Sequence, residues 1–541
     1  MRFSRRKFIG IPIVVVLLTL MAGATAVLAE SAGSLWPSAG QNLQNTRHAS
    51  SEKTIGHGNV RNLIKAWEAN TDGDVSATPA VDETNLYFPD AGGTLWALRR
   101  LDGSLVWKTT LMSYGLPPGD YARTTPVIAG NALIFGDQGG KFFAGAAVLA
   151  VDKSNGSLLW KTTVDPHFAA IVTQSAVWDA VSNRVYVGVS SNEEAWAAFI
   201  PGYVCCTFRG SMVALNATTG AIIWQTSMAP TGYSGNAIWG STPVIDRSRN
   251  SLYITTGNNY SVPASVSACV VAANGNPAAE QACLASNNYF DSIMSLALDT
   301  GAVQWSHRAV PFDAWIVSCI LDFGGAPCPS PAGPDYDFGQ GPMLFTANVP
   351  GRGPSQLLGA GQKSGQYWAL DPDDGSVVWV TQTGPGGTAG GLQWGSATDG
   401  QRVFTSNANS DHKTWALIKN GRPTGKSTDG GIWSALDAAT GKVLWQVANT
   451  TPDPLIPGMK AGSNAPVTLA NGIAYGCSLD PHGHMYAFDA VNGAKLWEFS
   501  ASDSGSCAAG PAIVDGSIYW GSGYGGFFGA PGNKMRAFRL P

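Results

Sequence analysis

The sequence predicts an all-β fold, an eight-bladed β-propeller, from three features of one repeated motif. Among the segments with a Gly four positions before a Trp, seven form a series in which successive Trp residues are 52–81 residues apart. Strand-like segments flank the motif, and an eighth copy is divided between the two ends of the chain. A unit that returns at such a period indicates an array of similar sheets. The seven copies are Gly103–Trp107, Gly156–Trp160, Gly220–Trp224, Gly301–Trp305, Gly375–Trp379, Gly441–Trp445 and Gly493–Trp497.

Each copy is interpreted as a β-hairpin with a tight turn. The Gly supplies the positive φ that such a turn needs, and an Asp or Asn four residues earlier accepts a hydrogen bond from a turn amide. A flat Trp at one fixed place after the turn suits docking between neighbouring blades. Five copies carry this acidic or amide residue: Asp152, Asn216, Asp371, Asp437 and Asp489.

The eighth blade is expected to form from both ends of the chain. Residues 535–538 repeat the strand that precedes the turn, and the chain stops three residues later. Residues 62–67 resemble the strand that follows the turn in the other copies. Pairing of these two segments would close the ring, so residues 30–541 are expected to form a single propeller domain.

The composition agrees with this fold and argues against one class of partner. The chain has 66 Gly and 19 Trp, and only 13% of its residues are charged, which suits many short strands and turns with much aromatic burial. The net charge is −4, so the sequence has no excess of positive charge to attract a phosphate backbone. Nucleic acid is therefore not an expected partner.

The first 29 residues are predicted to be an export signal. Residues 4–10 are close to the twin-arginine pattern, and an apolar run follows from 11 to 28. Small residues at 27–29 offer a cleavage site before Glu30. The mature protein is then expected to be periplasmic or secreted, without stable membrane insertion. The alternative is an uncleaved anchor, because the apolar run is nearly long enough to span a bilayer.

Eight cysteines in an exported chain favour disulfides. Proximity suggests three pairs, Cys269–Cys283, Cys319–Cys328 and Cys477–Cys507, which leaves the adjacent Cys205 and Cys206 to bond each other. Free thiols or separate half-cystines at 205 and 206 are the alternative. The chain has no Cys-x-x-Cys-His motif for a covalent c-type haem and no paired spacing typical of zinc sites.

The insertions between the repeats resemble those of a known family. The repeat is similar to that of the pyrroloquinoline quinone (PQQ) dehydrogenases, and the insertions resemble their subgroup of polyvinyl-alcohol dehydrogenases, over about Trp36 to Pro541. Several site motifs in the same order carry this resemblance better than the repeat alone, because non-catalytic propellers share the repeat. These segments are 189–194, 203–210, 237–240, 256–258, 313–315, 333–339, 361–365 and 519–524.

The resemblance implies a Ca²⁺ ion held against the quinone by a carboxylate and an amide oxygen, the hard ligands that Ca²⁺ requires. By position, Glu193 resembles the carboxylate ligand and Asn258 the amide ligand. Glu194 is the alternative to Glu193, because the local alignment can slip by one residue. Without such a site, Glu193 would be a solvated loop residue and Asn258 a turn residue.

The resemblance also implies which residues contact PQQ. Trp239 lies outside the Gly-x-x-x-Trp series and resembles the floor under the planar quinone, although an ordinary core Trp is the alternative. A Cys205–Cys206 disulfide would cover the opposite face. Lys363 resembles the cation that binds the quinone oxygens, with a surface lysine as the alternative. Further polar contacts to the cofactor are implied at Thr173, Ser190, Arg209 and Gln393.

The catalytic base departs from the pattern of the better-known family members. Those enzymes have Asp directly after the Trp of an Asp-x-Trp motif, whereas this chain has Ile316 after Trp315. Ile316 cannot accept a proton. Asp313 is the nearest carboxylate and the candidate catalytic base, and Glu193 is the alternative base.

The resemblance therefore implies a PQQ- and Ca²⁺-dependent alcohol dehydrogenase. Its substrate would be a small or polymeric alcohol, such as a secondary alcohol or polyvinyl alcohol. With no haem motif in the chain, a separate acceptor such as a cytochrome c would take the electrons. Sugar oxidation is a rival within the enzyme class. The opposing hypothesis is a non-catalytic propeller that acts as a scaffold or binding module, and Ile316 favours it.

Overall fold

The computed structural model describes Met1 and residues 35–139, 145–321, 323–526 and 528–541. Residues 33–541 form one compact unit. The predicted export signal lies outside the described residues, apart from Met1. Within the described ranges, no helix is both long and apolar enough to cross a membrane.

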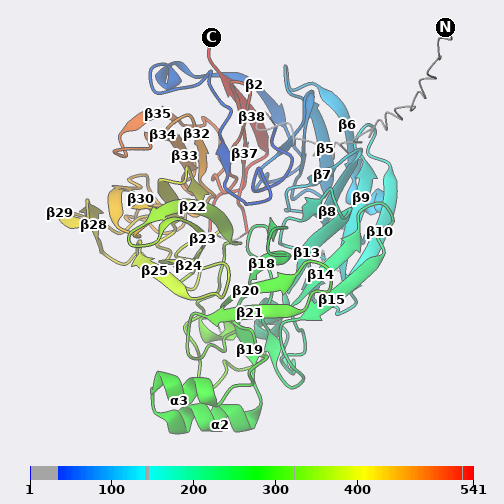
Figure 1. Cartoon of the computed structure of the whole chain (residues 1–541), viewed down its shortest axis with the longest axis vertical. Coiled ribbons are helices and arrows are strands. Elements are labelled where there is room, and N and C mark those ends of the chain that lie inside the picture. Colours follow the sequence, from blue (N-terminus) through cyan, green and yellow to red (C-terminus); the bar gives the residue numbers. More distant parts are fainter. Residues whose placement is uncertain (2–34, 140–144, 322, 527) are drawn as a thin grey trace. The chain divides into compact units, whose positions relative to one another are not determined.

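The described chain forms eight antiparallel blades that follow one another around a centre, as predicted (Figure 1). The first blade consists of β3 (Ala80–Val81), β4 (Asn85–Pro89), β5 (Thr94–Arg99) and β6 (Leu105–Thr110), and the second of β7 (Val127–Ala129), β8 (Ala132–Gly136), β9 (Ala146–Asp152) and β10 (Leu158–Asp165). The third consists of β12 (Val177–Asp179), β13 (Arg184–Ser191), β14 (Ser211–Asn216) and β15 (Ile222–Ser227), and the fourth of β17 (Val244–Asp246), β18 (Ser251–Thr255), β20 (Ser292–Ala297) and β21 (Val303–Arg308).

The last four blades continue the same order and bring the chain back to its start. The fifth blade consists of β22 (Met343–Val349), β23 (Gly353–Gly361), β24 (Gln366–Leu370) and β25 (Val377–Gln382), and the sixth of β26 (Ala397–Thr398), β27 (Arg402–Asn407), β30 (Ile432–Asp437) and β31 (Val443–Ala448). The seventh consists of β32 (Thr468–Ala470), β33 (Ile473–Cys477), β34 (Met485–Asp489) and β35 (Lys495–Phe499), and the eighth of β36 (Ala512–Val514), β37 (Ser517–Ser522), β38 (Lys534–Arg539) and β2 (Ile64–Asn70).

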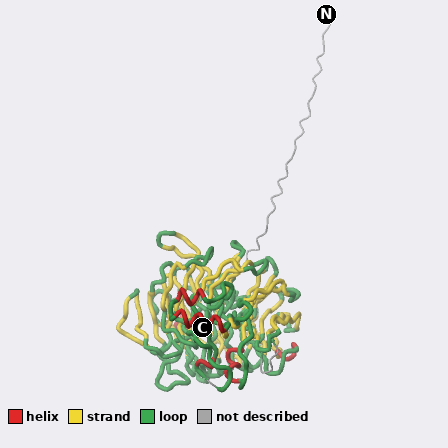
Figure 2. The backbone as a smooth tube through the Cα atoms, turned by 90° about the horizontal axis from the view of Figure 1, so that it is seen from below, coloured by secondary structure: helices red, strands yellow, loops and turns green. Residues whose placement is uncertain are grey.

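Short elements extend the blades or lie in insertions, and Figure 2 shows strands and loops with few helices. β1 (His48–Ala49) joins the seventh blade, and β11 (Ala170–Ile171) the third. The insertions carry β16 (Ser234–Gly235), β19 (Asn259–Ser261), β28 (Trp415–Lys419), β29 (Arg422–Thr428), α1 (Glu193–Phe199), α2 (Ala264–Ala273), α3 (Pro277–Ala282) and three 3-10 turns, η1 (Val60–Asn62), η2 (Leu111–Tyr114) and η3 (Val317–Cys319).

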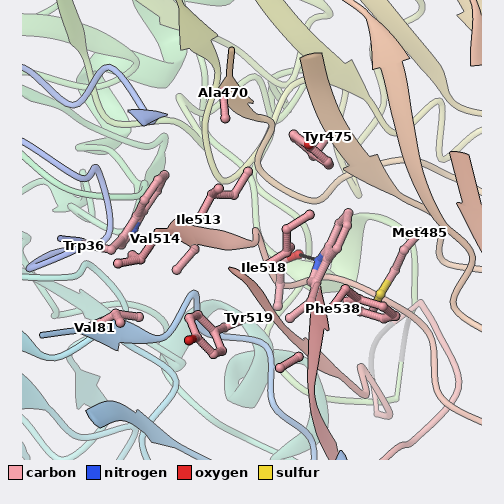
Figure 3. Packing of buried hydrophobic residues seen from close by; sticks show 14 of the residues in the cluster. Trp36, Val81, Ala470, Tyr475, Met485, Ile513, Val514, Ile518, Tyr519 and Phe538 are labelled. Atoms are coloured by element: carbon pink, nitrogen blue, oxygen red, sulfur yellow. Dashed lines mark hydrogen bonds between the residues drawn. The ribbon is translucent and has the colours of Figure 1, made fainter. Parts of the chain in front are cut away.

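The ring closes through the eighth blade, as predicted. β2 pairs antiparallel with β38, with Ile64 opposite Arg539 and Asn70 opposite Lys534. Buried side chains of the first, seventh and eighth blades meet at this junction (Figure 3). Trp36 also belongs to this junction, and its backbone exchanges two hydrogen bonds with that of Val81. Burial of this apolar surface stabilises the closure.

One contact repeats at every junction between blades. The indole Nε1 of each repeat Trp donates a hydrogen bond of 3.0–3.2 Å to a carbonyl of the next blade. The ring of Trp224, for example, covers Gly301, where an added Cβ would lie 2.4 Å from a ring carbon. All seven repeat Gly residues have φ of 71–75°. The predicted roles of the Gly and the Trp are confirmed.

The predicted turn role of the acidic and amide residues is confirmed too. Asp152 accepts a hydrogen bond from the backbone N–H of Ser154, and Asn216 accepts from Thr218 and Thr219. Asp371, Asp437 and Asp489 accept from the corresponding amides. These bonds satisfy turn amides that have no partner in the sheet.

The topology determines which loops share a face of the propeller. In a four-stranded antiparallel blade, the loop between the second and third strands emerges on the same side as the connection to the next blade. The long insertions of this chain are all of these two kinds. Most of the predicted site residues lie in such loops, so the fold brings them to one face.

We predict that Gly301→Ala destabilises the protein by about 2–4 kcal/mol, because the new methyl group needs both a strained φ and displacement of the Trp224 ring. Gly351 is the matched control, because its φ is 78° but no atom lies within 4 Å of an added Cβ. Gly351→Ala should cost only about 1 kcal/mol. Urea unfolding followed by Trp fluorescence measures both variants, and equal losses would contradict the docking role.

Candidate active site

Asp337 connects three of the predicted site residues. Its Oδ2 accepts a hydrogen bond of 2.8 Å from Trp239 Nε1 and lies 3.3 Å from the Nζ of Lys363. Its Oδ1 accepts a hydrogen bond of 2.7 Å from the backbone N–H of Asn258. Trp239, Asn258 and Lys363 come from three different insertions, and this carboxylate brings them together.

Lys363 is a buried cation above an aromatic ring. Its Nζ lies 2.9 Å from Asp335 Oδ1 and 5.3 Å from the centre of the Trp239 ring. Burial by itself lowers the pKa of Lys363, but the carboxylates of Asp335, Asp337 and Glu194 raise it above its usual value. Lys363 is therefore protonated at neutral pH and is not a surface lysine.

Asp335 completes this charged cluster. It is fully buried, and burial raises its pKa well above the usual value, although Lys363 opposes the shift. Its Oδ2 has no hydrogen-bond partner among the described residues. A buried polar atom without a partner is unusual in a folded protein, so this oxygen is available to a ligand.

The two adjacent glutamates at the start of α1 have different surroundings. Glu193 is fully buried, and both carboxylate oxygens accept hydrogen bonds from the segment 203–208. Glu194 is only partly buried and interacts electrostatically with Lys363 and Asp337. Burial raises the pKa of Glu194 to about 7, with Lys363 opposing the shift. The pKa of Glu194, the predicted alternative to Glu193, thus responds to the charges of Lys363 and Asp337.

Asn258 is oriented by its own side-chain amide. Its Nδ2 donates hydrogen bonds to the carbonyls of Asn259 and Trp315, at 3.0 and 2.9 Å. No described residue donates a hydrogen bond to its Oδ1. An amide oxygen without a donor suits a cation. Within the described ranges, no group of three or more His, Cys, Asp and Glu has the arrangement of a metal site.

The four disulfides pair as the sequence suggested. Cys205 bonds to Cys206, and the other pairs are Cys269–Cys283, Cys319–Cys328 and Cys477–Cys507. Cys205, Cys206 and Trp239 are partly buried against the same apolar cluster, which also contains Tyr260 and Ile316. The adjacent pair thus lies in the part of the structure that holds the predicted aromatic floor.

Asp313 lies beneath the loop that carries Asp335. It is fully buried, and its oxygens accept hydrogen bonds from the backbone N–H groups of Asp335 and Tyr336, at 3.2 and 2.8 Å. Burial raises its pKa to about 6, and its carboxyl group interacts with that of Asp291, whose pKa is raised well above the usual value. Ile316 is buried in the neighbouring apolar cluster.

Three site residues escaped the sequence analysis: Arg123, Trp394 and Tyr524. The Arg123 guanidinium lies 4.5 Å from the centre of the Trp394 ring and 5.5 Å from that of Tyr524. Trp394 packs edge-on against Trp239, with ring centres 5.4 Å apart. Trp394 could have been found, because it also lies outside the Gly-x-x-x-Trp series. Arg123 belongs to no recognisable motif.

The four residues predicted as further polar contacts to the cofactor lie in different parts of the structure. Thr173 lines a small central cavity with Arg123 and Trp394, and Gln393 packs beside Gly339, which also contacts Trp239. Ser190 is buried at the end of β13. Arg209 is exposed, its guanidinium faces the carbonyl of Ala229, and it lines a separate depression. Arg209 therefore lines a different cavity from Arg123 and Trp394.

The chain is similar to several known proteins. The family model described as outer membrane protein assembly factor BamB matches residues 64–307 and 290–529. A polyvinylalcohol dehydrogenase of Sphingopyxis sp. (strain 113P3) is 31% identical over 89% of this chain and 73% of its own length. A polyvinylalcohol dehydrogenase of Pseudomonas sp. is 29% identical over the same shares. The solved quinohemoprotein alcohol dehydrogenase ADHIIG of Pseudomonas putida HK5 has a TM-score of 0.67 at 16% identity, covering 94% of this chain and 80% of that one.

The chain therefore belongs to the quinoprotein alcohol dehydrogenase family, together with the polyvinyl-alcohol dehydrogenases, and it is an oxidoreductase that acts on CH–OH groups. Membership implies an alcohol substrate, an electron acceptor and a cofactor of the PQQ type.

We predict that peptide mapping of the unreduced protein recovers Cys205 and Cys206 in one peptide, bonded to each other. The expected mass is two hydrogen atoms lower than that of the reduced peptide. A link from either residue to Cys269 or Cys477 would contradict the pairing. The Cys319–Cys328 peptides serve as the internal control for reshuffling during digestion.

Proposed function

We propose that this enzyme is a PQQ- and Ca²⁺-dependent dehydrogenase of a secondary or polymeric alcohol and that a separate carrier, such as a cytochrome c, takes its electrons. One observation carries the proposal: Asp337 holds the indole of Trp239, the ammonium of Lys363 and the backbone of Asn258 at a single point. A scaffold has no need for a buried cation above an aromatic ring, because burying charge is costly.

The residues present fit both groups. PQQ is planar and carries carboxylates, and the partly exposed Trp239 ring offers it a stacking surface. Lys363 and Arg123 are cations on either side of the Trp239–Trp394 pair. Glu194 and the unpaired Oδ1 of Asn258 supply oxygen ligands for Ca²⁺. Thr173 and Gln393 would contact the rim of the cofactor, and the Cys205–Cys206 disulfide its other face.

When bound, the quinone supplies the electrophilic carbon that accepts hydride from the alcohol. The chain's own residues orient the reactants and move the proton. The hydrogen bond to Asp337 fixes the plane of the Trp239 ring, and the buried carboxylates keep Lys363 protonated. Asp313 is the base that takes the alcohol proton, because its pKa of about 6 leaves it ionised at neutral pH.

The cellular location follows from the leader and the disulfides. Residues 1–29 are proposed to direct export, with residues 30–541 as the mature single-domain propeller. Four disulfides suit an oxidising compartment such as the periplasm or the medium.

We predict that the purified protein retains PQQ after desalting only when Ca²⁺ is present, as measured by the absorbance of bound quinone. Glu194→Gln should raise the Ca²⁺ concentration needed for half-retention by at least tenfold, because a charged ligand of a hard cation is lost. Glu280→Gln in α3 is the control for the change of charge. Failure to retain PQQ at any Ca²⁺ concentration would contradict the proposed cofactor.

We predict that Asp313→Asn lowers kcat by about 10²–10⁴-fold while PQQ is still retained, because a positioned base contributes on that order. Burial raises the pKa of Asp313 from 3.8 to about 6, so the wild-type enzyme should lose activity as the pH falls through 6. This acidic limb should be absent from the residual activity of the variant. Alcohol-dependent dye reduction over pH 5–8 measures both effects, and an unchanged kcat would exclude Asp313 as the base.

A further inference from the structure

Glu193 is a buried carboxylate that the proposed chemistry does not use. Its Oε1 accepts hydrogen bonds from Tyr203 Oη at 2.5 Å and from the backbone N–H of Thr207 at 2.9 Å. Its Oε2 accepts one from the backbone N–H of Phe208 at 2.8 Å, and the Thr207 hydroxyl donates another to Oε1 at 3.3 Å. Hydrogen bonds to an ionised group are roughly twice as strong as those between neutral groups.

These donors lie on both sides of the Cys205–Cys206 disulfide in the chain. Tyr203 precedes the pair by two residues, and Thr207 and Phe208 follow it directly. One carboxylate therefore ties the two ends of the short loop that carries the disulfide. Thr207 and Arg209 are exposed and Val204 is largely exposed, whereas Cys205 and Cys206 are partly buried and Phe208 is buried.

The helix that carries Glu193 is itself anchored. The backbone N–H of Ala326 donates a hydrogen bond of 2.7 Å to the carbonyl of Ala197 in α1, and an added Cβ on Gly325 would clash with that same carbonyl. The Cys319–Cys328 disulfide closes the loop that makes this contact. Glu193 thus connects a fixed element to the loop that carries the disulfide.

We propose that Glu193 is a positioning residue that clamps the Cys205–Cys206 loop onto α1 and so holds the disulfide over the cofactor site. Glu194 is the next residue on the helix, about 100° further around the axis, and it interacts with Lys363 instead. The two glutamates then have different roles: the Glu193 carboxylate binds the loop, and the Glu194 carboxylate binds the ligand. The consequence for cofactor binding rests on the function proposed above, whereas the clamp itself does not.

The rate at which the Cys205–Cys206 bond is reduced tests the clamp without any cofactor. The full-length protein is treated with a water-soluble phosphine, quenched with iodoacetamide at intervals and analysed by peptide mass spectrometry. Glu193→Gln should speed reduction of this bond by about 10–100-fold, the order expected when one or two charge-assisted hydrogen bonds are lost. Glu194→Gln is the matched control and should leave the rate within about twofold. The buried Cys477–Cys507 bond reports general unfolding and should keep its wild-type rate in both variants.

A milder variant keeps the test decisive if Glu193→Gln does not fold. Tyr203→Phe removes one donor and no charge, and it should speed reduction by about 3–10-fold. An unchanged reduction rate in the folded variants would overturn the proposal. A Glu193→Gln variant that needs more Ca²⁺ for PQQ retention, as expected of Glu194→Gln, would also overturn it, because Glu193 would then be a ligand. If the wild-type protein retains no PQQ, the proposed cofactor fails while the reduction rates still decide the clamp.

Discussion

The contact between a repeat Trp and the Gly of the next blade is the constraint on which the structure depends. It occurs at each junction after a repeat Gly-containing hairpin, and it combines a stacked indole, a hydrogen bond and a left-handed turn without a Cβ. Each blade alone exposes two apolar faces, and only its neighbours cover them. The ring therefore closes as a unit, with the terminal strands β2 and β38 completing the last blade.

The candidate site exists because the ring holds loops from several blades against one another. Lys363 and the carboxyl groups of Asp335 and Asp337 lie in an interior position, which is unfavourable for charged groups unless they are paired. Their pairing requires the loop after β21 and the turn before β24 to meet. The rigid propeller holds these two segments in contact, and the Trp239 ring lies below the ammonium group of Lys363. The division of labour between Glu193 and Glu194 follows from the same rigidity, since α1 faces a loop on one side and the charged cluster on the other.

Local sequence motifs identified part of the site correctly by position. Trp239, Asn258 and Lys363 each lie within a short motif, and the structure brings all three together. Asp337 lay in a segment that carried the family resemblance, but nothing in its neighbours indicated that it would join three insertions. Arg123 could not be predicted, because its importance comes from stacking on Trp394, more than 250 residues away along the chain. Arg209 lines a different cavity from Arg123, and its contact with the cofactor stays a prediction.

The sequence by itself determined the repeat, the number of blades and the closure of the ring, and it suggested the pairing of the cysteines. These features depend on spacing along the chain and on turn chemistry, and short segments of sequence are enough to define both. Only the tertiary structure decided which of two adjacent glutamates accepts hydrogen bonds from the disulfide loop. Neighbouring residues on a helix differ by about 100° in direction, so a shift of one position changes every partner. Sequence similarity does not resolve such a shift, whereas the hydrogen bonds of Tyr203, Thr207 and Phe208 to Glu193 do.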